Sequence, residues 1–265
     1  MKNALKSKIE SGQNCVNGWL SVPSGYSAEV MARSGWDSLT VDLQHGVQDY
    51  GSMVQCLQAI AAFPVTPLVR VPTNETGIIG KALDAGAWGI ICPMVNSPEE
   101  AAALVSACLY PPHGRRSNGP NRATSYADHR PYQAFANDEV MVLPMIETAE
   151  AVASLEQILD VPGVGGAYIG PSDLGLAHGL PPIFDREEPE MLAIYDRVVR
   201  ETARRGQIAG IHTLDAAYAA RMFDMGFRFA TVASDAALMA KGAQAILKTL
   251  EQAHATQAAV RKQVS

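Results

Sequence analysis

The chain has 265 residues, of which 48% are hydrophobic and 18% charged, and its formal net charge is −6 at pH 7. These values are typical of a globular protein and argue against a nucleic-acid-binding protein, whose surface needs clustered Lys and Arg. No apolar run reaches the ~18 residues of a membrane span, and the charged segment from Met1 to Lys8 lacks the apolar core of a signal peptide. We therefore expect a cytoplasmic protein that binds neither nucleic acid nor membrane.

Eight short apolar runs have the character of buried strands, and longer helix-like segments separate them. The strand-like runs are Val16–Val22, Ser38–Gln44, Thr66–Val71, Gly89–Val95, Val140–Glu147, Gly165–Gly170, Ile208–Thr213 and Phe229–Ala233. The helix-like segments are Tyr26–Arg33, Tyr50–Ala62, Glu75–Ala85, Pro98–Leu109, Ala149–Leu159, Pro189–Arg205, Leu214–Asp224 and Ala236–Thr256. This alternation predicts an α/β fold with a parallel sheet, and at this length it favours a (β/α)8 TIM barrel that forms a single domain over residues 1–265. An open, doubly wound sheet is the alternative, although no Gly-x-Gly-x-x-Gly motif follows a strand.

Two segments interrupt the alternation. Pro111–Asn137 is rich in Arg, Asn, Gly, Pro and Tyr and has no clear period, which is typical of a functional or disordered loop. His178–Arg186 is a second irregular stretch. We expect the long, Ala-rich last helix to pack on a neighbouring subunit. The four cysteines have no Cys-x-x-Cys spacing, which favours buried thiols over a disulfide framework.

Polar side chains end several of the predicted strands. The run that begins at Ser38 ends in Asp42, Gln44 and His45, and burying such groups without partners costs roughly 2–7 kcal/mol each. A barrel gathers its chemistry at the carboxyl ends of its strands. Taken in chain order, the candidates at these ends are Trp19, His45, Arg70, Asn96, Glu147, Asp173 and His212.

Glu147 and Asp173 follow neighbouring strands and are expected at the same level of the barrel. The pair fits a hard divalent metal such as Mg²⁺ or Mn²⁺, which takes one or two carboxylates together with water and substrate oxygens. It also fits a general acid and base, as in glycosidases, or two structural helix caps. These three interpretations remain open at this point.

Arg70 ends an apolar strand, so its guanidinium is expected in the mouth of the barrel, where a permanent cation needs an anion. That anion is either Asp42 or Glu147 in a structural salt bridge, or an oxygen of the substrate. His45 is the one histidine that ends a strand beside acids. Since imidazole can act as a base near neutral pH, His45 is a candidate base, with a structural histidine as the alternative.

Together these residues predict chemistry on a 2-oxo acid. A metal on Glu147 and Asp173 would bind the carboxylate and keto oxygens of the acid, and the backbone of Gly170–Asp173 would add an anion seat at the start of a helix. The metal and Arg70 would stabilise the charge of the enolate, while His45 moves the proton. No Lys ends a strand, which argues against a Schiff-base aldolase.

At these residues the chain resembles the HpcH/HpaI family of metal-dependent (class II) 2-oxo-acid aldolases, over nearly its whole length. The matching stretches are Asp42-x-x-His45, Arg70-Val71-Pro72, Leu83-Asp84-Ala85-Gly86-Ala87, Cys92-Pro93-Met94-Val95, Tyr110-Pro111-Pro112-x-Gly114-x-Arg116, Ile146-Glu147-Thr148 and Ile169-Gly170-Pro171-Ser172-Asp173-Leu174. The resemblance implies a TIM barrel that uses Mg²⁺, Mn²⁺ or Co²⁺ to cleave 4-hydroxy-2-oxo acids into pyruvate and an aldehyde. It also implies a homo-oligomer, typically a hexamer, and a role in the catabolism of aromatic compounds or sugar acids.

The same resemblance implies residue roles. Glu147 and Asp173 are then the metal ligands, and His45 is the base. Arg70 stabilises the enolate, and the main chain of Ser172 meets the pyruvate carboxylate.

The acid that supports His45 has two candidates. Asp84 matches the family's acid, whereas Asp42 is closer to His45 in the sequence. Because Asp84 stands near the end of a helix that should face the opposite end of the barrel, we expect it to act across a subunit contact.

Three residues depart from the family pattern. Gln44 stands where several members have Glu, Met145 where some have a substrate-contacting Gln, and His212 where an apolar residue is usual. We expect Trp19, Met145 and His212 to contact the substrate, with packing under the Pro111–Asn137 loop as the alternative for His212. These changes predict pyruvate or hydroxypyruvate chemistry with an aldehyde other than that of the heptanedioate.

Two other functions compete with the aldolase. An acyl-CoA lyase of the citramalyl or malyl type shares the metal and the carboxylates, and it needs a basic cleft for the nucleotide. The candidates for such a cleft are Arg115, Arg116, Arg122 and Arg130. The second competing function is that of a catalytically silent barrel that serves as an assembly subunit.

Overall fold

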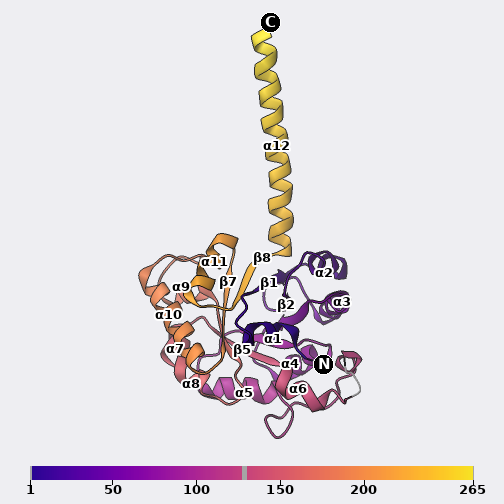
Figure 1. Cartoon of the computed structure of the whole chain (residues 1–265), viewed down its shortest axis with the longest axis vertical. Coiled ribbons are helices and arrows are strands. Elements are labelled where there is room, and N and C mark those ends of the chain that lie inside the picture. The colour runs from indigo at the N-terminus through magenta and orange to yellow at the C-terminus, as the bar shows by residue number, and fades with distance from the viewer. Residues whose placement is uncertain (1, 127–129, 265) are drawn as a thin grey trace.

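Eight parallel strands form a closed barrel in which each strand pairs with the next along the chain and β8 returns to β1. The strands are β1 Cys15–Leu20, β2 Ser38–Asp42, β3 Thr66–Arg70, β4 Gly89–Cys92, β5 Met141–Ile146, β6 Gly166–Ile169, β7 Ile208–Thr213 and β8 Phe229–Ser234. The structure is a computed structural model that describes residues 2–126 and 130–264 (Figure 1). The predicted TIM barrel is confirmed, and the open sheet is excluded.

Helices surround the barrel, apart from the last helix, which projects away from it (Figure 1). They are α1 Ala4–Glu10, α2 Gly25–Ala32, α3 Tyr50–Ile60, α4 Thr76–Asp84, α5 Pro98–Cys108, the 3₁₀ turn η1 Ala123–Tyr126, α6 Gln133–Glu139, α7 Ala149–Ala153, α8 Leu155–Leu159, α9 Pro171–Ala177, α10 Pro189–Arg204, α11 Ala216–Met225 and α12 Asp235–Val264. Local signals fix several of their ends. Ser97 caps α5 by accepting from the backbone N–H of Glu100, and α11 ends at Gly226 in the left-handed region.

Side-chain alternation along each strand decides which residues face the barrel interior, because successive side chains point to opposite faces. Leu68 belongs to the interior cluster, and Val69 belongs to the cluster between strands and helices. Arg70 has the parity of Leu68 and therefore turns inward at the strand end. The same reasoning turns Asp42 and His212 inward.

The amino end of the barrel is closed by α1, which the sequence reading did not predict. Its Leu5 and Ile9 pack into the interior cluster with Phe229. The side chain of Asn3 caps the helix by accepting from the backbone N–H of Lys6. Because α1 has only 7 residues, it offers too few turns for a clear helical period.

The Pro111–Asn137 segment has more order than its composition indicates. Its described part contains η1 and α6, while residues 127–129 lie outside the described residues. Tyr132 and Phe135 pack with Trp88 and Tyr110 in a small apolar cluster of their own. The disordered alternative is therefore wrong for the described residues, since aromatic packing orders them.

Two other predictions about helices need correction. The helix expected at Ala149–Leu159 divides at Ser154 into α7 and α8. The last helix continues beyond Thr256, and α12 projects away from the barrel (Figure 1). None of the described helices combines the length and the apolar character that crossing a bilayer requires. All four cysteines are buried and free, as predicted.

Candidate active site

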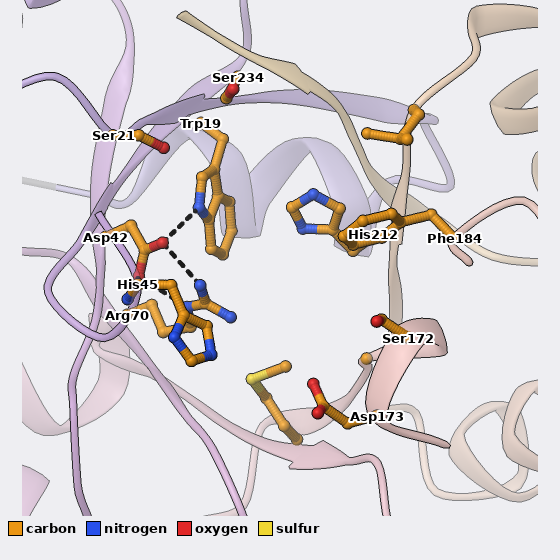
Figure 2. A pocket seen from close by; sticks show the side chains of 13 residues that line it. Trp19, Ser21, Asp42, His45, Arg70, Ser172, Asp173, Phe184, His212 and Ser234 are labelled. Carbon is orange, nitrogen blue, oxygen red and sulfur yellow. Dashed lines mark hydrogen bonds and ion pairs between the residues drawn. The ribbon is translucent and has the colours of Figure 1, made fainter. Parts of the chain in front are cut away.

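A cavity of about 410 Å³ opens at the carboxyl ends of the strands (Figure 2). Most of the residues that the sequence placed at the site line it, namely Trp19, Asp42, His45, Arg70, Met145, Ser172, Asp173 and His212. They come from loops and strand ends that are far apart in the sequence. The closed barrel brings them together because all its parallel strands end on the same face.

Arg70 and Asp42 form the best-defined interaction of the cavity. The Arg70 Nε donates to Asp42 Oδ1 at 2.8 Å, and Nη2 donates to Oδ2 at 2.6 Å. Both residues are buried, and their Cα atoms are partners across β2 and β3. The indole of Trp19 also donates to Asp42 Oδ2 at 3.0 Å, and the Arg70 guanidinium lies 4.8 Å from the centre of the Trp19 ring.

Asp42 stays ionised in this environment. Burial alone would raise the pKa of its carboxyl, but the hydrogen bonds and charge of Arg70 outweigh burial, together with the Trp19 and His45 N–H groups. The pKa of Asp42 therefore lies below its usual range. The pair is neutral overall. Arg70 Nη1 makes no hydrogen bond to the described residues. It is not fully buried, so it is left for a ligand oxygen.

The side chain of His45 stands at the cavity rim and is exposed. Its backbone N–H donates to Asp42 Oδ1 at 3.2 Å, and the N–H of Gln44 donates to the same oxygen at 3.0 Å. Asp42 thus shapes the turn that presents His45. No hydrogen bond joins the Asp42 carboxylate to the imidazole in the described part of the chain.

Glu147 and Asp173 occupy adjoining strand ends, as the sequence predicted. Ile146 pairs with Ile169 across β5 and β6, Glu147 is the next residue, and Asp173 lies in the first turn of α9. Asp173 is exposed in the cavity lining, whereas Glu147 is buried and does not line the cavity. Glu147 Oε1 accepts from the backbone N–H of Met94 at 2.8 Å.

Gly170 makes room for the Glu147 carboxylate. A Cβ at Gly170 would lie 2.4 Å from Glu147 Oε2 and 2.9 Å from Met145 Cε. Glu147 Oε2 has no hydrogen-bond partner among the described residues, and it is not fully buried. Burial, with a contribution from the Asp173 charge, raises the pKa of Glu147 to about 7 despite the Met94 N–H and Arg70.

These two carboxylates fit a divalent cation in their donor chemistry. A cation beside Glu147 would offset the cost of burying its negative charge. Within the described ranges no three His, Cys, Asp or Glu side chains gather as a metal site. A metal held here would therefore keep coordination positions for water and substrate oxygens. Mg²⁺ and Mn²⁺ usually bind in this way, whereas a structural zinc does not.

His212 faces the cavity between two aromatic rings. Its ring centre lies 4.8 Å from that of Trp19 and 5.0 Å from that of Phe184. Phe184 belongs to the irregular His178–Arg186 stretch, so this stretch covers His212. The alternative of packing under the Pro111–Asn137 loop was wrong, because the described part of that loop contacts the amino end of the barrel.

The arginines of that loop do not form a basic cleft at the cavity. Arg116 is buried and donates to Asp84 Oδ1 at 2.7 Å. Arg122 donates to the carbonyl oxygens of Ala85, which follows α4, and of Leu57, in the last turn of α3. The cavity lining includes none of the four arginines Arg115, Arg116, Arg122 and Arg130, so the acyl-CoA lyase loses the feature that would support it.

Asp84 is the one predicted site residue that this chain holds away from the others. It ends α4 and pairs with Arg116, far from the strand ends that carry His45. Within one chain Asp42 is therefore the acid beside His45.

Four lining residues were not predicted from the sequence: Ser21, Phe184, Leu214 and Ser234. Phe184 lies in a segment without periodicity. Ser21, Leu214 and Ser234 stand next to or within strand ends that were recognised, but their side chains carry no charge that would single them out.

Comparisons with known proteins agree with this geometry. Residues 18–242 match the family described as HpcH/HpaI aldolase/citrate lyase. A hydroxypyruvate/pyruvate aldolase of Rhizorhabdus wittichii is 38% identical over 245 residues, which is 92% of this chain and 97% of that protein. A 4-hydroxy-2-oxo-heptane-1,7-dioate aldolase of Klebsiella pneumoniae is 38% identical over 93% of each chain. The crystal structure of an HpcH/HpaI aldolase/citrate lyase family protein from Burkholderia cenocepacia superposes with a TM-score of 0.88 at 31% identity, over 94% of this chain and 100% of that one.

Proposed function

This chain belongs to the HpcH/HpaI aldolase/citrate lyase family, and we propose that it is a pyruvate aldolase. It is a carbon–carbon lyase that cleaves a 4-hydroxy-2-oxo acid into an aldehyde and pyruvate or hydroxypyruvate, and runs the reverse condensation. One observation carries the proposal: His45 and Arg70 share one cavity with Ser172 and Asp173, on opposite sides of it (Figure 2). A base and an oxyanion stabiliser thus face the end of the cavity that carries Asp173.

The chemistry follows from these positions. In cleavage, a base takes the proton of the C4 hydroxyl, the C3–C4 bond breaks, and its electron pair moves toward the C2 keto oxygen to give an aldehyde and an enolate. His45 is placed to take that proton, directly or through water. Arg70 Nη1 is free to stabilise the enolate oxygen, since Nε and Nη2 are held by Asp42. Protonation of the enolate at C3 completes pyruvate.

We further propose that Glu147 and Asp173 hold a divalent metal, Mg²⁺, Mn²⁺ or Co²⁺. A metal so held would supply Lewis-acid polarisation of the keto group. Gly170 supports the proposal, since its missing side chain leaves Glu147 Oε2 room. Ser172, next to Asp173 in the lining, is placed to meet the substrate carboxylate through its main chain.

The assembly we propose is a homo-oligomer, a hexamer by family resemblance, with α12 packed on a neighbouring subunit. Met239, Ile246 and Leu250 support this, since they are spaced on one face of α12 and are 56%, 72% and 51% exposed. Such a row of apolar side chains on a helix clear of its own barrel needs a partner surface. A single barrel domain over residues 1–265 and a cytoplasmic location remain predictions from the sequence.

The test is an assay of pyruvate release from a panel of 4-hydroxy-2-oxo acids with added Mg²⁺ or Mn²⁺. We expect pyruvate from the 4-hydroxy-2-oxo acids. We expect no release of free coenzyme A from acyl-CoA substrates. Release of free coenzyme A from a malyl- or citramalyl-CoA, without aldol cleavage of the free acids, would overturn the proposal in favour of a lyase.

A further inference from the structure

A buried amide anchors a hydrogen-bond network inside the barrel. Asn17 Oδ1 accepts from the hydroxyls of Ser38 at 2.8 Å and Thr40 at 3.1 Å. Its other end, Nδ2, donates to Thr231 Oγ1 at 2.8 Å. All four residues are completely buried. The amide thus has hydroxyl partners at both ends, and in this orientation it donates to Thr231 Oγ1.

The network continues from Thr231 to the cavity. Tyr168 Oη lies 2.5 Å from Thr231 Oγ1 and 3.4 Å from His212 Nδ1. Since Thr231 already accepts from Asn17, its own proton is available to Tyr168, and the proton of Tyr168 is then available to His212 Nδ1. In that arrangement His212 Nδ1 accepts and carries no proton, so a neutral His212 has its proton on Nε2.

The surroundings of His212 favour its neutral form. Burial, and then the Arg70 charge, lowers its pKa to about 3. His212 Nε2 has no hydrogen-bond partner among the described residues, and it is not fully buried. His212 thus offers the cavity one neutral N–H donor, and Trp19 and Phe184 hold the ring in place.

Among the described residues of the lining, no unpaired Arg or Lys lies beside that donor. Figure 2 shows His212 beside Phe184 and away from Asp42 and His45. Among the described lining residues Arg70 is the only Arg or Lys, and Asp42 already neutralises it. A carboxylate at this end of a substrate would find no ion-pair partner, and burying an unpaired charge is costly.

We propose that His212 is a specificity-determining residue whose Nε2–H binds a hydroxyl of the aldehyde moiety, so that the enzyme prefers short hydroxyaldehydes to aldehydes that end in a carboxylate. Tyr168 acts through His212 as a positioning residue, because it fixes the tautomer that donates. The inference rests on the aldolase function proposed above and names the class of aldehyde for the same site.

The experiment compares condensation of pyruvate with four aldehydes by kcat/KM. Glycolaldehyde and acetaldehyde differ by one hydroxyl, and succinic semialdehyde and butanal differ chiefly by a carboxylate. We expect the glycolaldehyde/acetaldehyde ratio of the wild type to fall about five- to tenfold in His212→Leu, the scale of one neutral hydrogen bond. His212→Gln, which keeps an N–H donor, should retain much of the ratio, and Tyr168→Phe should lose part of it.

Metal-dependent exchange of the pyruvate methyl protons with D₂O, measured without aldehyde, tests the aldolase function separately from the proposal about His212. We expect it unchanged in the control His113→Leu, whose histidine is exposed and outside the cavity. If the wild type fails to exchange, the aldolase function is overturned. If exchange is intact but the aldehyde ratio is the same in wild type and His212→Leu, or succinic semialdehyde is the best acceptor, the inference about His212 alone is overturned.

Discussion

Arg70 and Asp42 join the last residues of β3 and β2 through two parallel N–H···O contacts, at 2.8 and 2.6 Å. The sequence left open whether Arg70 is bound in a salt bridge or faces the substrate. The geometry combines both, since the ion pair takes one edge of the guanidinium and leaves Nη1 at the cavity. A cation held this rigidly needs little reorganisation when charge develops on the substrate.

Replacing Arg70 tests that arrangement. We expect Arg70→Ala to lower turnover by about 10²–10³, the scale of a lost charge-stabilising donor. It should also lower the free energy of unfolding by about 3–5 kcal/mol, because Asp42 is left buried without its partner. Kinetics and thermal unfolding measure the two effects. Arg197→Ala, which breaks a half-exposed pair with Glu156, is the control and should leave turnover unchanged. A loss of turnover of tenfold or less would make Arg70 a structural residue only.

The raised pKa of Glu147 predicts a pH dependence of the metal-free protein. Because the folded pKa, about 7, exceeds the ordinary value of 4.5, folding favours the protonated form. That stabilisation is complete below about pH 4.5 and is lost as pH rises through 7, by about 3 kcal/mol at 1.36 kcal/mol per pKa unit. Glu147→Gln should lack this decline in denaturant unfolding at pH 5 and 8. Since protons compete with the metal, Mg²⁺ should bind more tightly as pH rises over the same range. Identical pH profiles for wild type and variant would contradict the assignment.

A methyl group at Gly170 should disable the proposed metal site. Its Cβ would lie 2.4 Å from Glu147 Oε2, so Gly170→Ala must displace the carboxylate. We expect Mg²⁺ affinity, measured by calorimetry, to fall at least tenfold while the barrel remains folded. The matched control is Gly80→Ala in α4, where an added Cβ meets nothing within 4 Å and should be neutral or stabilise the helix by up to about 1 kcal/mol. Unchanged affinity in Gly170→Ala would remove Glu147 from the site.

Asp84→Asn separates the two acids proposed for His45. Asp84 supports the buried Arg116 at 2.7 Å but is itself 30% exposed, so we expect a loss of stability of about 1–2 kcal/mol, less than for a fully buried pair. Thermal unfolding and methyl-proton exchange are measured on the same sample. If exchange falls steeply while the melting temperature is unchanged, Asp84 takes part in the chemistry, which its position allows only across a subunit contact.

The barrel could be predicted because its strands are short, apolar and regularly spaced. Leu68 in the barrel interior and Val142 between strands and helices need only burial, and burial is visible as hydrophobicity. By contrast, α1 and α6 have 7 residues each, which is too short for a helical period to stand out. Their order comes from tertiary contacts such as those of Leu5 and Phe135, and a local pattern does not encode such contacts.

The cavity could be predicted in part for a related reason. Charged side chains such as Arg70 and Asp173 are conspicuous where an apolar strand ends. Phe184 is apolar and lies in a segment without period, so nothing local marks it as a lining residue. The state of His212 depends on Tyr168 and Thr231, residues that are distant in the sequence. Only the closed barrel shows that these side chains meet.

The central claim is that Glu147 and Asp173 share one divalent ion that activates pyruvate. The most direct measurement is exchange of the pyruvate methyl protons with D₂O, followed by NMR while Mg²⁺ or Mn²⁺ is titrated into chelator-treated protein. We predict exchange that saturates at one metal per chain, stops in excess chelator, and is lost in Asp173→Asn and Glu147→Gln. Exchange that continues at the same rate in excess chelator would contradict it.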